Sequence, residues 1–169
     1  GVSDRQVDLI QEGVDCVIRT GELNNSSLVA RPLGRFRWVT CASPDYLREY
    51  GVPPSPEALS QHRAVHYFSG QARRADEFRF IRHGETFSVP VSGNAAVNET
   101  GLYIKMCLAG FGLAQLAENI VADHLQEGRL VEVLTDWQLP PVPVTLLYPH
   151  QRFLSPAVRA FAEWMSEVV

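Results

Sequence analysis

Cysteine and histidine are the residue types most able to hold a metal, and this sequence spreads both without a recognisable pattern. Its three cysteines, Cys16, Cys41 and Cys107, are far apart, and each lies in a largely apolar run. A disulfide framework or a zinc site requires paired or closely spaced ligands. We therefore predict three free thiols in a reducing compartment, buried as small apolar residues rather than acting as redox sensors.

Among the five histidines, only His62 and His66 stand four residues apart. Two histidines at this spacing share a metal when both lie on one helix. Here they straddle the end of a short predicted helix and the start of a strand, so we predict no metal and no cofactor. The neighbours Asp123 and His124 could mimic an acid–base pair, but they are more typical of the solvated face of a helix.

Motifs for nucleophilic catalysis and phosphate binding are absent from the sequence. No G-x-S-x-G segment is present. The stretch Gly110-Phe111-Gly112 lacks both the spacing and the following lysine of a phosphate loop. We therefore predict that the chain is not an enzyme.

Length and composition limit the remaining classes. A chain of 169 residues fits one domain or two small lobes. A hydrophobic share of 46% and a charged share of 20% exclude disordered, collagen-like and coiled-coil chains. No apolar run is long enough to cross a membrane. A formal charge of -4 and a single lysine, Lys105, argue against nucleic-acid binding by this chain itself.

The hydrophobic pattern predicts an α/β chain with mixed sheets. Residues 14–19 form a mostly apolar strand, as in a parallel sheet covered on both faces. Thr20 follows at its carboxyl end, which is where ligands bind in open α/β sheets. Ser43 is expected to cap a helix that starts at Pro44. The other predicted strands are 27–33, 36–42, 64–68, 77–81, 85–90, 89–97, 113–117, 129–134 and 144–148, and the other helices are 3–13, 56–60, 99–109, 117–126 and 156–169.

Two of these segments carry specific turn signals. Arg82-His83-Gly84 indicates a hairpin between the strands on either side of it. Gly93 indicates a bulge within the extended segment 89–97.

The order of several motifs resembles the effector-binding domain of LysR-type transcriptional regulators. The segment Ala42-Ser43-Pro44-Asp45-Tyr46-Leu47 matches one family motif, and its specificity comes from the ordered set around it. The other matching segments are 3–21, 26–33, 50–53, 57–62, Asn98, 109–113, 127–134 and 148–161.

The resemblance implies two Rossmann-like α/β lobes with mixed sheets, joined by two crossover strands, as in type II periplasmic binding proteins. Lobe I would contain residues 1–40 and 143–169, and lobe II residues 41–142. The family's winged helix-turn-helix, its linker helix and the first strand-helix-strand unit of lobe I have no counterpart in this sequence. Lobe I is therefore expected to be incomplete within this chain.

The resemblance also implies a small effector in the cleft between the lobes. Arg19 is the strongest cation at the ligand-facing strand end and can clamp a carboxylate, although a surface ion pair with Asp15 or Glu22 remains open. Asn98 is expected to cap the following helix, whose N-terminus can receive an anion even though Glu99 already places a negative charge there. The candidate effector-binding residues are Ser3, Arg19, Thr20, Cys41, Ser43, Asn98, Glu99 and Thr100.

Other conspicuous side chains have simpler interpretations. Core packing is favoured over an aromatic wall of the site for Trp38, Phe111 and Trp137. A solvated face is the default for the arginines at positions 73, 74, 79 and 82.

Two functions from different classes remain. The first is the ligand-sensing domain of a cytoplasmic regulator that acts as a homodimer or homotetramer, contacts DNA only through an N-terminal module and does not contact a membrane. The alternative is a free-standing periplasmic solute-binding protein for a small polar molecule. The lack of a signal peptide argues only weakly against the alternative, because the sequence does not start with methionine.

Overall fold

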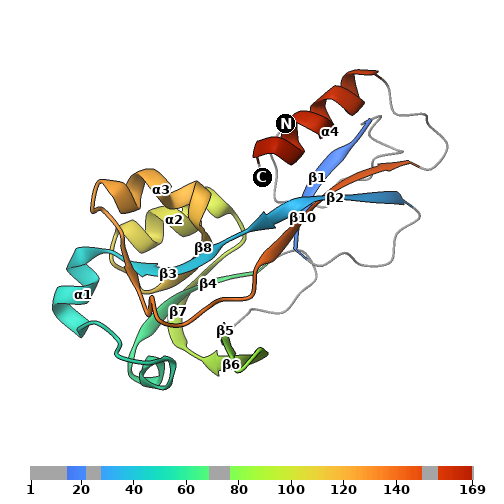
Figure 1. Cartoon of the computed structure of the whole chain (residues 1–169). Coiled ribbons are helices and arrows are strands. Elements are labelled where there is room, and N and C mark those ends of the chain that lie inside the picture. The colour runs from blue at the N-terminus through green and yellow to red at the C-terminus, as the bar shows by residue number, and fades with distance from the viewer. Residues whose placement is uncertain (1–14, 22–27, 69–76, 150–155, 169) are drawn as a thin grey trace. The chain divides into compact units, whose positions relative to one another are not determined.

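The computed structural model describes residues 15–21, 28–68, 77–149 and 156–168 (Figure 1). The predicted helix at 3–13 therefore lies outside the described residues. In chain order the elements are β1 (Val17–Thr20), β2 (Leu28–Phe36), β3 (Trp38–Ala42), α1 (Pro44–Tyr50), the 3-10 helix η1 (Pro56–Gln61), β4 (Arg63–Tyr67), β5 (Glu77–Arg82), β6 (Glu85–Pro90), β7 (Ser92–Val97), α2 (Thr100–Leu108), β8 (Ala114–Ala117), α3 (Glu118–Gln126), β9 (Val131–Val133), β10 (Val142–Pro149) and α4 (Pro156–Val168).

These elements form two compact units. The described residues of unit 1 run from Arg37 to Pro140, and those of unit 2 lie before Arg37 and after Pro140. The predicted lobe boundaries, after residues 40 and 142, fall inside β3 and at the start of β10. The assignment of the units to lobes stays a prediction.

Strand direction in unit 1 creates one edge at which several strands end. β4 pairs in parallel with β7, and a parallel bridge between Ala64 and Leu113 joins β4 to the start of β8. The carboxyl ends of β4, β7 and β8, marked by Tyr67, Val97 and Ala117, therefore lie at the same edge. We call this the carboxyl edge of unit 1. β3 runs antiparallel to β8 and β9, so it begins at this edge.

Both faces of the unit 1 strands are buried, as two separate core clusters show. Val39 and Cys41 of β3 pack with residues of α2 and α3. Ala42 packs with α1, η1 and the β5–β6 hairpin. In β4, Ala64 and Val65 divide between the two clusters in the same way, as the alternation of side chains along a strand requires. Figure 1 shows α2 and α3 side by side, away from the hairpin.

The hairpin and bulge predictions are confirmed. β5 and β6 pair in register around a two-residue turn, in which His83 and Gly84 have φ of 53° and 81°. Positive φ at both positions defines a type I′ turn, whose twist suits a hairpin. The register of β7 against β4 shifts beside Gly93, where a Cβ atom would lie 2.0 Å from the Ala64 carbonyl oxygen. Only glycine permits this approach.

Unit 2 corrects part of the strand prediction. β1 pairs antiparallel with β10, not within a parallel sheet, and β10 also pairs antiparallel with β2. An apolar run indicates burial on both faces but does not fix strand direction. The predicted break at Gly34 is also wrong, because β2 continues to Phe36 and the strands separate at Arg37.

Helix α4 covers one face of the β1–β10–β2 sheet. Its Ala162 and Met165 pack against Leu33, Val144 and Leu146. The opposite face of β10 is also buried, at Thr145 and Leu147. Within the described parts of the chain, no helix is both long enough and apolar enough to span a membrane.

The described core predicts that the same change, Phe to Ala, lowers the unfolding free energy by very different amounts at two positions. Phe80→Ala removes a fully buried ring and should cost about 3–5 kcal/mol of unfolding free energy, as is typical for a buried Phe. Phe111→Ala, at a side chain that is 57% exposed, should change it by no more than about 0.5 kcal/mol. Urea unfolding of both variants checks this, and equal losses would contradict the core described above.

Candidate functional site

The carboxyl edge of unit 1 gathers side chains from several elements. Tyr67 ends β4, and Asn98 and Glu99 connect β7 to α2. The Phe68 N–H donates to the Val97 carbonyl oxygen at 2.9 Å, which extends the pairing of β4 and β7 to this point. Ligands of open α/β sheets bind at the carboxyl ends of parallel strands. This edge is therefore the candidate binding site of unit 1.

The cap of α2 is Glu99, which corrects the prediction for Asn98. The Glu99 carboxylate accepts hydrogen bonds from the N–H groups of Gly101 and Leu102, at 2.7 and 2.6 Å. Because β7 runs to Val97 and α2 begins at Thr100, the cap position falls one residue later than predicted. These two N–H groups are occupied by the chain's own anion. They are not open to an anionic ligand, and the turn presents negative charge.

Tyr67 is a residue of this edge that sequence reasoning missed. Its ring packs against that of Tyr103 from α2, with centroids 5.5 Å apart. The Tyr103 hydroxyl accepts a hydrogen bond from the Gln115 N–H at 3.1 Å, and burial raises the pKa of Tyr103. The available signal was position, since Tyr67 lies near the end of a predicted strand just as Thr20 does.

Arg37 joins the start of α3 to β9. Its guanidinium contacts Glu118 at 2.8 Å and Glu132 at 2.6 Å, and its carbonyl oxygen accepts from the Glu118 N–H at 2.9 Å. Glu118 begins α3 directly after β8, and Glu132 lies in β9. One cation between two anions leaves a net negative charge beside the start of β3.

Other predicted site residues lie in unit 2 or outside the described residues. Arg19 and Thr20 end β1, opposite Thr145 and Val144 of β10. Arg19 is half-buried and Thr20 is exposed. Ser3 lies outside the described residues. Arg19 and Thr20 thus belong to unit 2, whereas Tyr67, Asn98 and Glu99 belong to unit 1.

Cys41 and Ser43 have internal roles in the structure. Cys41 is fully buried in the core cluster beneath α2, where the Cys107 thiol lies 3.6 Å from the Cys41 carbonyl oxygen. The contact with Cys41 and burial raise the pKa of Cys107. Ser43 is the predicted cap of α1, and its Oγ accepts from the Tyr46 N–H at 3.2 Å. The prediction of free thiols is confirmed. The prediction of burial is confirmed for Cys41 and Cys107 but is wrong for Cys16, which is half-buried.

A buried polar contact anchors α1 to β4. The Tyr46 hydroxyl lies 3.1 Å from His62 Nδ1 and accepts from the Arg63 N–H at 2.9 Å. His62 is 7% exposed, and burial lowers its pKa. The neutral imidazole is therefore favoured in the folded chain. No group of three metal-ligating side chains occurs within residues 15–21, 28–68, 77–149 and 156–168.

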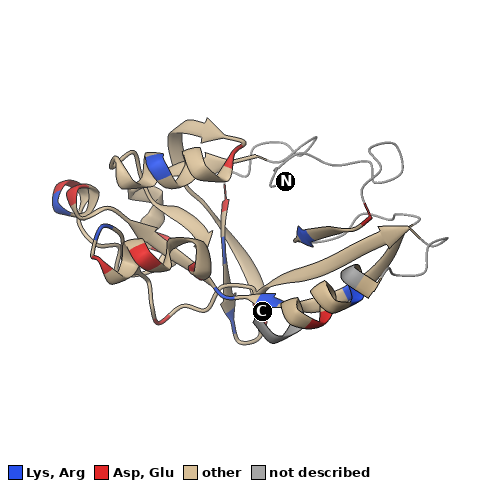
Figure 2. Ribbon diagram, turned by 90° about the horizontal axis from the view of Figure 1, so that it is seen from above, with Lys and Arg blue, Asp and Glu red and all other residues tan. Residues whose placement is uncertain are grey.

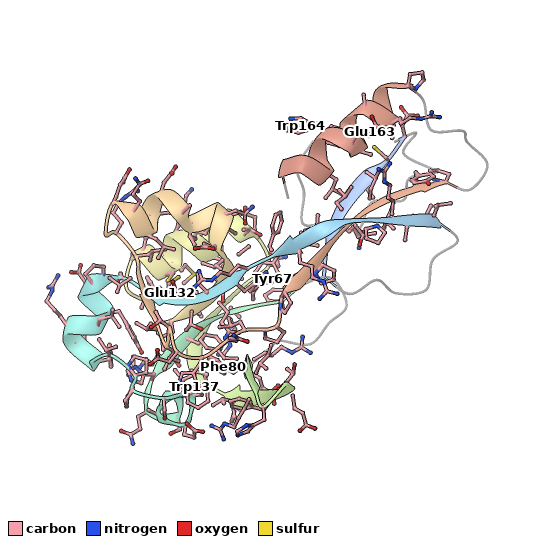
Figure 3. The ribbon with its side chains drawn as sticks, viewed as in Figure 1. Tyr67, Phe80, Glu132, Trp137, Glu163 and Trp164 are labelled. Carbon is pink, nitrogen blue, oxygen red and sulfur yellow. The ribbon has the colours of Figure 1, made fainter. Side chains whose placement is uncertain are left out.

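Arg82 of the hairpin makes specific contacts, although the sequence predicted a solvated face for it. The Arg82 guanidinium lies over the rings of Phe87 and Trp137, 4.8 and 4.9 Å from their centroids. It also pairs with Glu57 of η1, and this pairing lowers the pKa of Glu57 to about 2. Figure 3 shows Trp137 close to Phe80 of the hairpin, consistent with the expected core packing. Arg73 and Arg74 lie outside the described residues.

A hollow of about 610 Å³ opens elsewhere on unit 1. None of the predicted site residues lines it. Arg63 starts β4 and Asn94 is near the start of β7, so the hollow faces the opposite strand ends from the carboxyl edge. The predicted core role of Phe111 is wrong, because its exposed ring lines this hollow.

Comparison with known proteins identifies the family. Residues 1–169 match the family described as LysR substrate binding domain. The chain belongs to this family. It is 37% identical over 166 residues to an uncharacterised HTH-type transcriptional regulator of Escherichia coli, YhjC, covering 98% of the chain and 56% of the relative. An HTH-type transcriptional repressor of Pseudomonas aeruginosa is also 37% identical, with 98% and 52% covered.

A solved structure supports the same family and fold. The regulatory domain of CrgA, a LysR-type transcriptional regulator from Neisseria meningitidis, superposes with a TM-score of 0.78 at 26% identity, covering 94% of this chain and 77% of that one. The expected type II periplasmic-binding-protein-like fold is thereby confirmed, and the named relatives are regulators rather than solute-binding proteins. This LysR domain spans about half the length of the curated relatives it matches.

The buried state of His62 predicts acid sensitivity. Its pKa is lowered in the folded chain from an unperturbed value of about 6.5, so the unfolded chain takes up the proton first as pH falls. Stability should be complete above about pH 6.5 and decrease below it. Unfolding midpoints measured between pH 8 and 5 should fall less steeply in His62→Asn than in the parent chain.

His83→Asn is the matched control, since His83 is exposed in the hairpin turn. It should keep the pH dependence of the parent. If the unfolding midpoint of His62→Asn depended on pH as steeply as that of the parent chain, the proposed effect of burying His62 would be contradicted.

The thiols should differ in reactivity. Iodoacetamide at pH 8 should modify half-buried Cys16 first, while Cys41 and Cys107, both fully buried, should react only on unfolding. Peptide mass spectrometry measures the three rates. Modification of Cys107 as fast as that of Cys16 would contradict the burial described here.

Proposed function

We propose that this chain is the sensing domain of a bacterial transcriptional regulator, binding a small effector and modulating transcription through a DNA-binding module elsewhere in the protein. The observation that carries this proposal is the carboxyl edge of unit 1, where three parallel strands end beside Tyr67 and the start of α2, in a chain of the LysR family. An effector changes transcription only if it binds one conformational state better than another.

The proposed contacts come from residues of both units. In unit 1, Tyr67, Asn98 and Thr100 face the effector, and Glu99 repels an anion from this end. In unit 2, Arg19 clamps a carboxylate and Thr20 adds a hydroxyl. A further contact from Ser3 belongs to the same proposal. Cys41 and Ser43 are buried at the other end of β3, away from the carboxyl edge, and are left out of the proposed contacts.

The partners of the whole protein follow from the same proposal. Acidic and basic residues are mixed along the helices of unit 1 (Figure 2). The formal charge of the chain is -4. Neither favours DNA contact by this domain. DNA is contacted by an N-terminal helix-turn-helix module, the protein acts in the cytoplasm as a homodimer or homotetramer, and no catalysis is involved.

The proposal predicts an effector that stabilises the chain and changes promoter binding. In a metabolite screen, a ligand at about 100 times its Kd adds about 2.7 kcal/mol, which raises the Tm of a chain this size by roughly 5–10 °C. The hit should alter the gel shift of the full-length regulator on its own promoter. Failure to bind that promoter in any condition would contradict the proposal.

Arg19→Gln tests the carboxylate clamp with the same hit. Loss of a charge-assisted hydrogen bond, about 1.5–3 kcal/mol, should weaken a carboxylate effector about tenfold or more. Arg35→Gln, at an exposed arginine of β2, should leave the affinity unchanged. Equal affinities for all three proteins would exclude Arg19 from the site.

A further inference from the structure

The hollow near Phe111 has the dimensions of a small-molecule site. Its volume of about 610 Å³ lies within the range of roughly 300–1,000 Å³ that is typical of ligand pockets. It lies at the amino ends of β4 and β7, whereas the effector site proposed above lies at their carboxyl ends. An occupant of the hollow would therefore be bound in addition to the effector.

The turn that ends α2 holds one wall of the hollow in place. Gly110 has a φ of 80°, and the next N–H, that of Phe111, donates to the Met106 carbonyl oxygen at 3.1 Å. This is a Schellman motif, which brings the side chains of Phe111 and Met106 beside each other. The Leu113 N–H donates to the Arg63 carbonyl oxygen at 2.9 Å and ties the turn to β4. Backbone hydrogen bonds therefore hold the Phe111 ring, which is 57% exposed, at the hollow.

A second wall of the hollow pairs a cation with an aromatic ring. The Arg63 guanidinium lies over the Tyr50 ring, 5.4 Å from its centroid, and the Tyr50 ring stacks on that of Tyr46 at 4.7 Å. Within the described parts of the chain, no ion pair joins this guanidinium to a carboxylate. Stacking on a ring orients a guanidinium and leaves its N–H donors available to a ligand.

The rest of the lining leaves room for a flat group and adds no acid. Ala95, Ala96 and Ala109 contribute small side chains, and Asn94 is uncharged. Among the described residues that line the hollow, Arg63 is charged and none is acidic.

The carboxyl end of α2 also meets the hollow, and the carbonyl groups there carry partial negative charge. The N–H groups of Gly110 and Phe111 already bond two of these carbonyl groups. A helix terminus also contributes less than a charge-assisted hydrogen bond from a guanidinium. The hollow therefore favours an anion.

We propose that the hollow binds a planar aromatic carboxylate, with its ring against Phe111 and its carboxylate on the Arg63 guanidinium. The paired N–H donors of an arginine match the two oxygens of a carboxylate, and an aromatic ring packs favourably against another planar ring. This gives unit 1 a second ligand site, which is independent of whether the carboxyl edge binds the effector.

Three probes of one size separate the contribution of the charge from that of the ring. They are 2-naphthoate, its uncharged amide 2-naphthamide, and the saturated acid decahydro-2-naphthoate. Amide ¹H–¹⁵N spectra of the chain give the affinity of each probe from the shifts of Gly110, Phe111 and Gly112. At these residues 2-naphthoate should bind about tenfold or more tighter than the amide, and about two- to tenfold tighter than the saturated acid.

Variants of the two walls test the assignment of the contacts. Arg63→Gln should weaken 2-naphthoate about tenfold or more, and Phe111→Ala about two- to tenfold. Arg48→Gln is the matched control, because this exposed arginine of α1 does not line the hollow, and it should keep the parent affinity. Arg19→Gln should also leave the shifts at the hollow unchanged, which separates them from binding by unit 2.

Three results would overturn the proposal. The first is that 2-naphthoate causes no shift at residues 110–112. The second is that 2-naphthamide binds there as tightly as 2-naphthoate. The third is that Arg63→Gln binds 2-naphthoate as tightly as the parent chain does.

Discussion

The pairing of β3 with both β8 and β9 is the constraint on which the rest of unit 1 depends. Its residues serve both core clusters, with Val39 and Cys41 on one side and Ala42 on the other. Because side chains alternate along a strand, a slip of one residue would exchange the two faces and bury the wrong set. The same register places Trp38 opposite Ala117, at the carboxyl edge, and brings Ser43 to the cap of α1.

Local signals in the sequence predicted much of this arrangement. The His83-Gly84 turn requires positive φ at two positions, and Gly93 accommodates a close backbone approach, so both have a local physical cause. Ser43 before Pro44 located the start of α1 for the same reason. The fold of the whole chain was predicted from the ordered resemblance to the LysR family. Local signals such as caps and turns predict single elements but not how distant segments combine into two units.

The predictions that were wrong concern features set by contacts between residues far apart in the sequence. Burial of β1 gave no information on the direction of its partner β10, which comes more than a hundred residues later. Asn98 has the better intrinsic preference for a cap, but the end of β7 shifts that position to Glu99. Phe111 is apolar yet exposed, because the turn after α2 carries it to the surface hollow. Tyr67 became a candidate only when the parallel pairing of β4 and β7 showed where both strands end.

The central claim is that the carboxyl edge of unit 1 receives the effector. Amide hydrogen exchange of the chain, with and without a compound that raises its Tm and alters promoter binding, tests this claim most directly. The account predicts added protection at Tyr67–Phe68 and at the start of α2, with little change around the hollow near Phe111. Protection confined to the hollow, with none at the carboxyl edge, would contradict it.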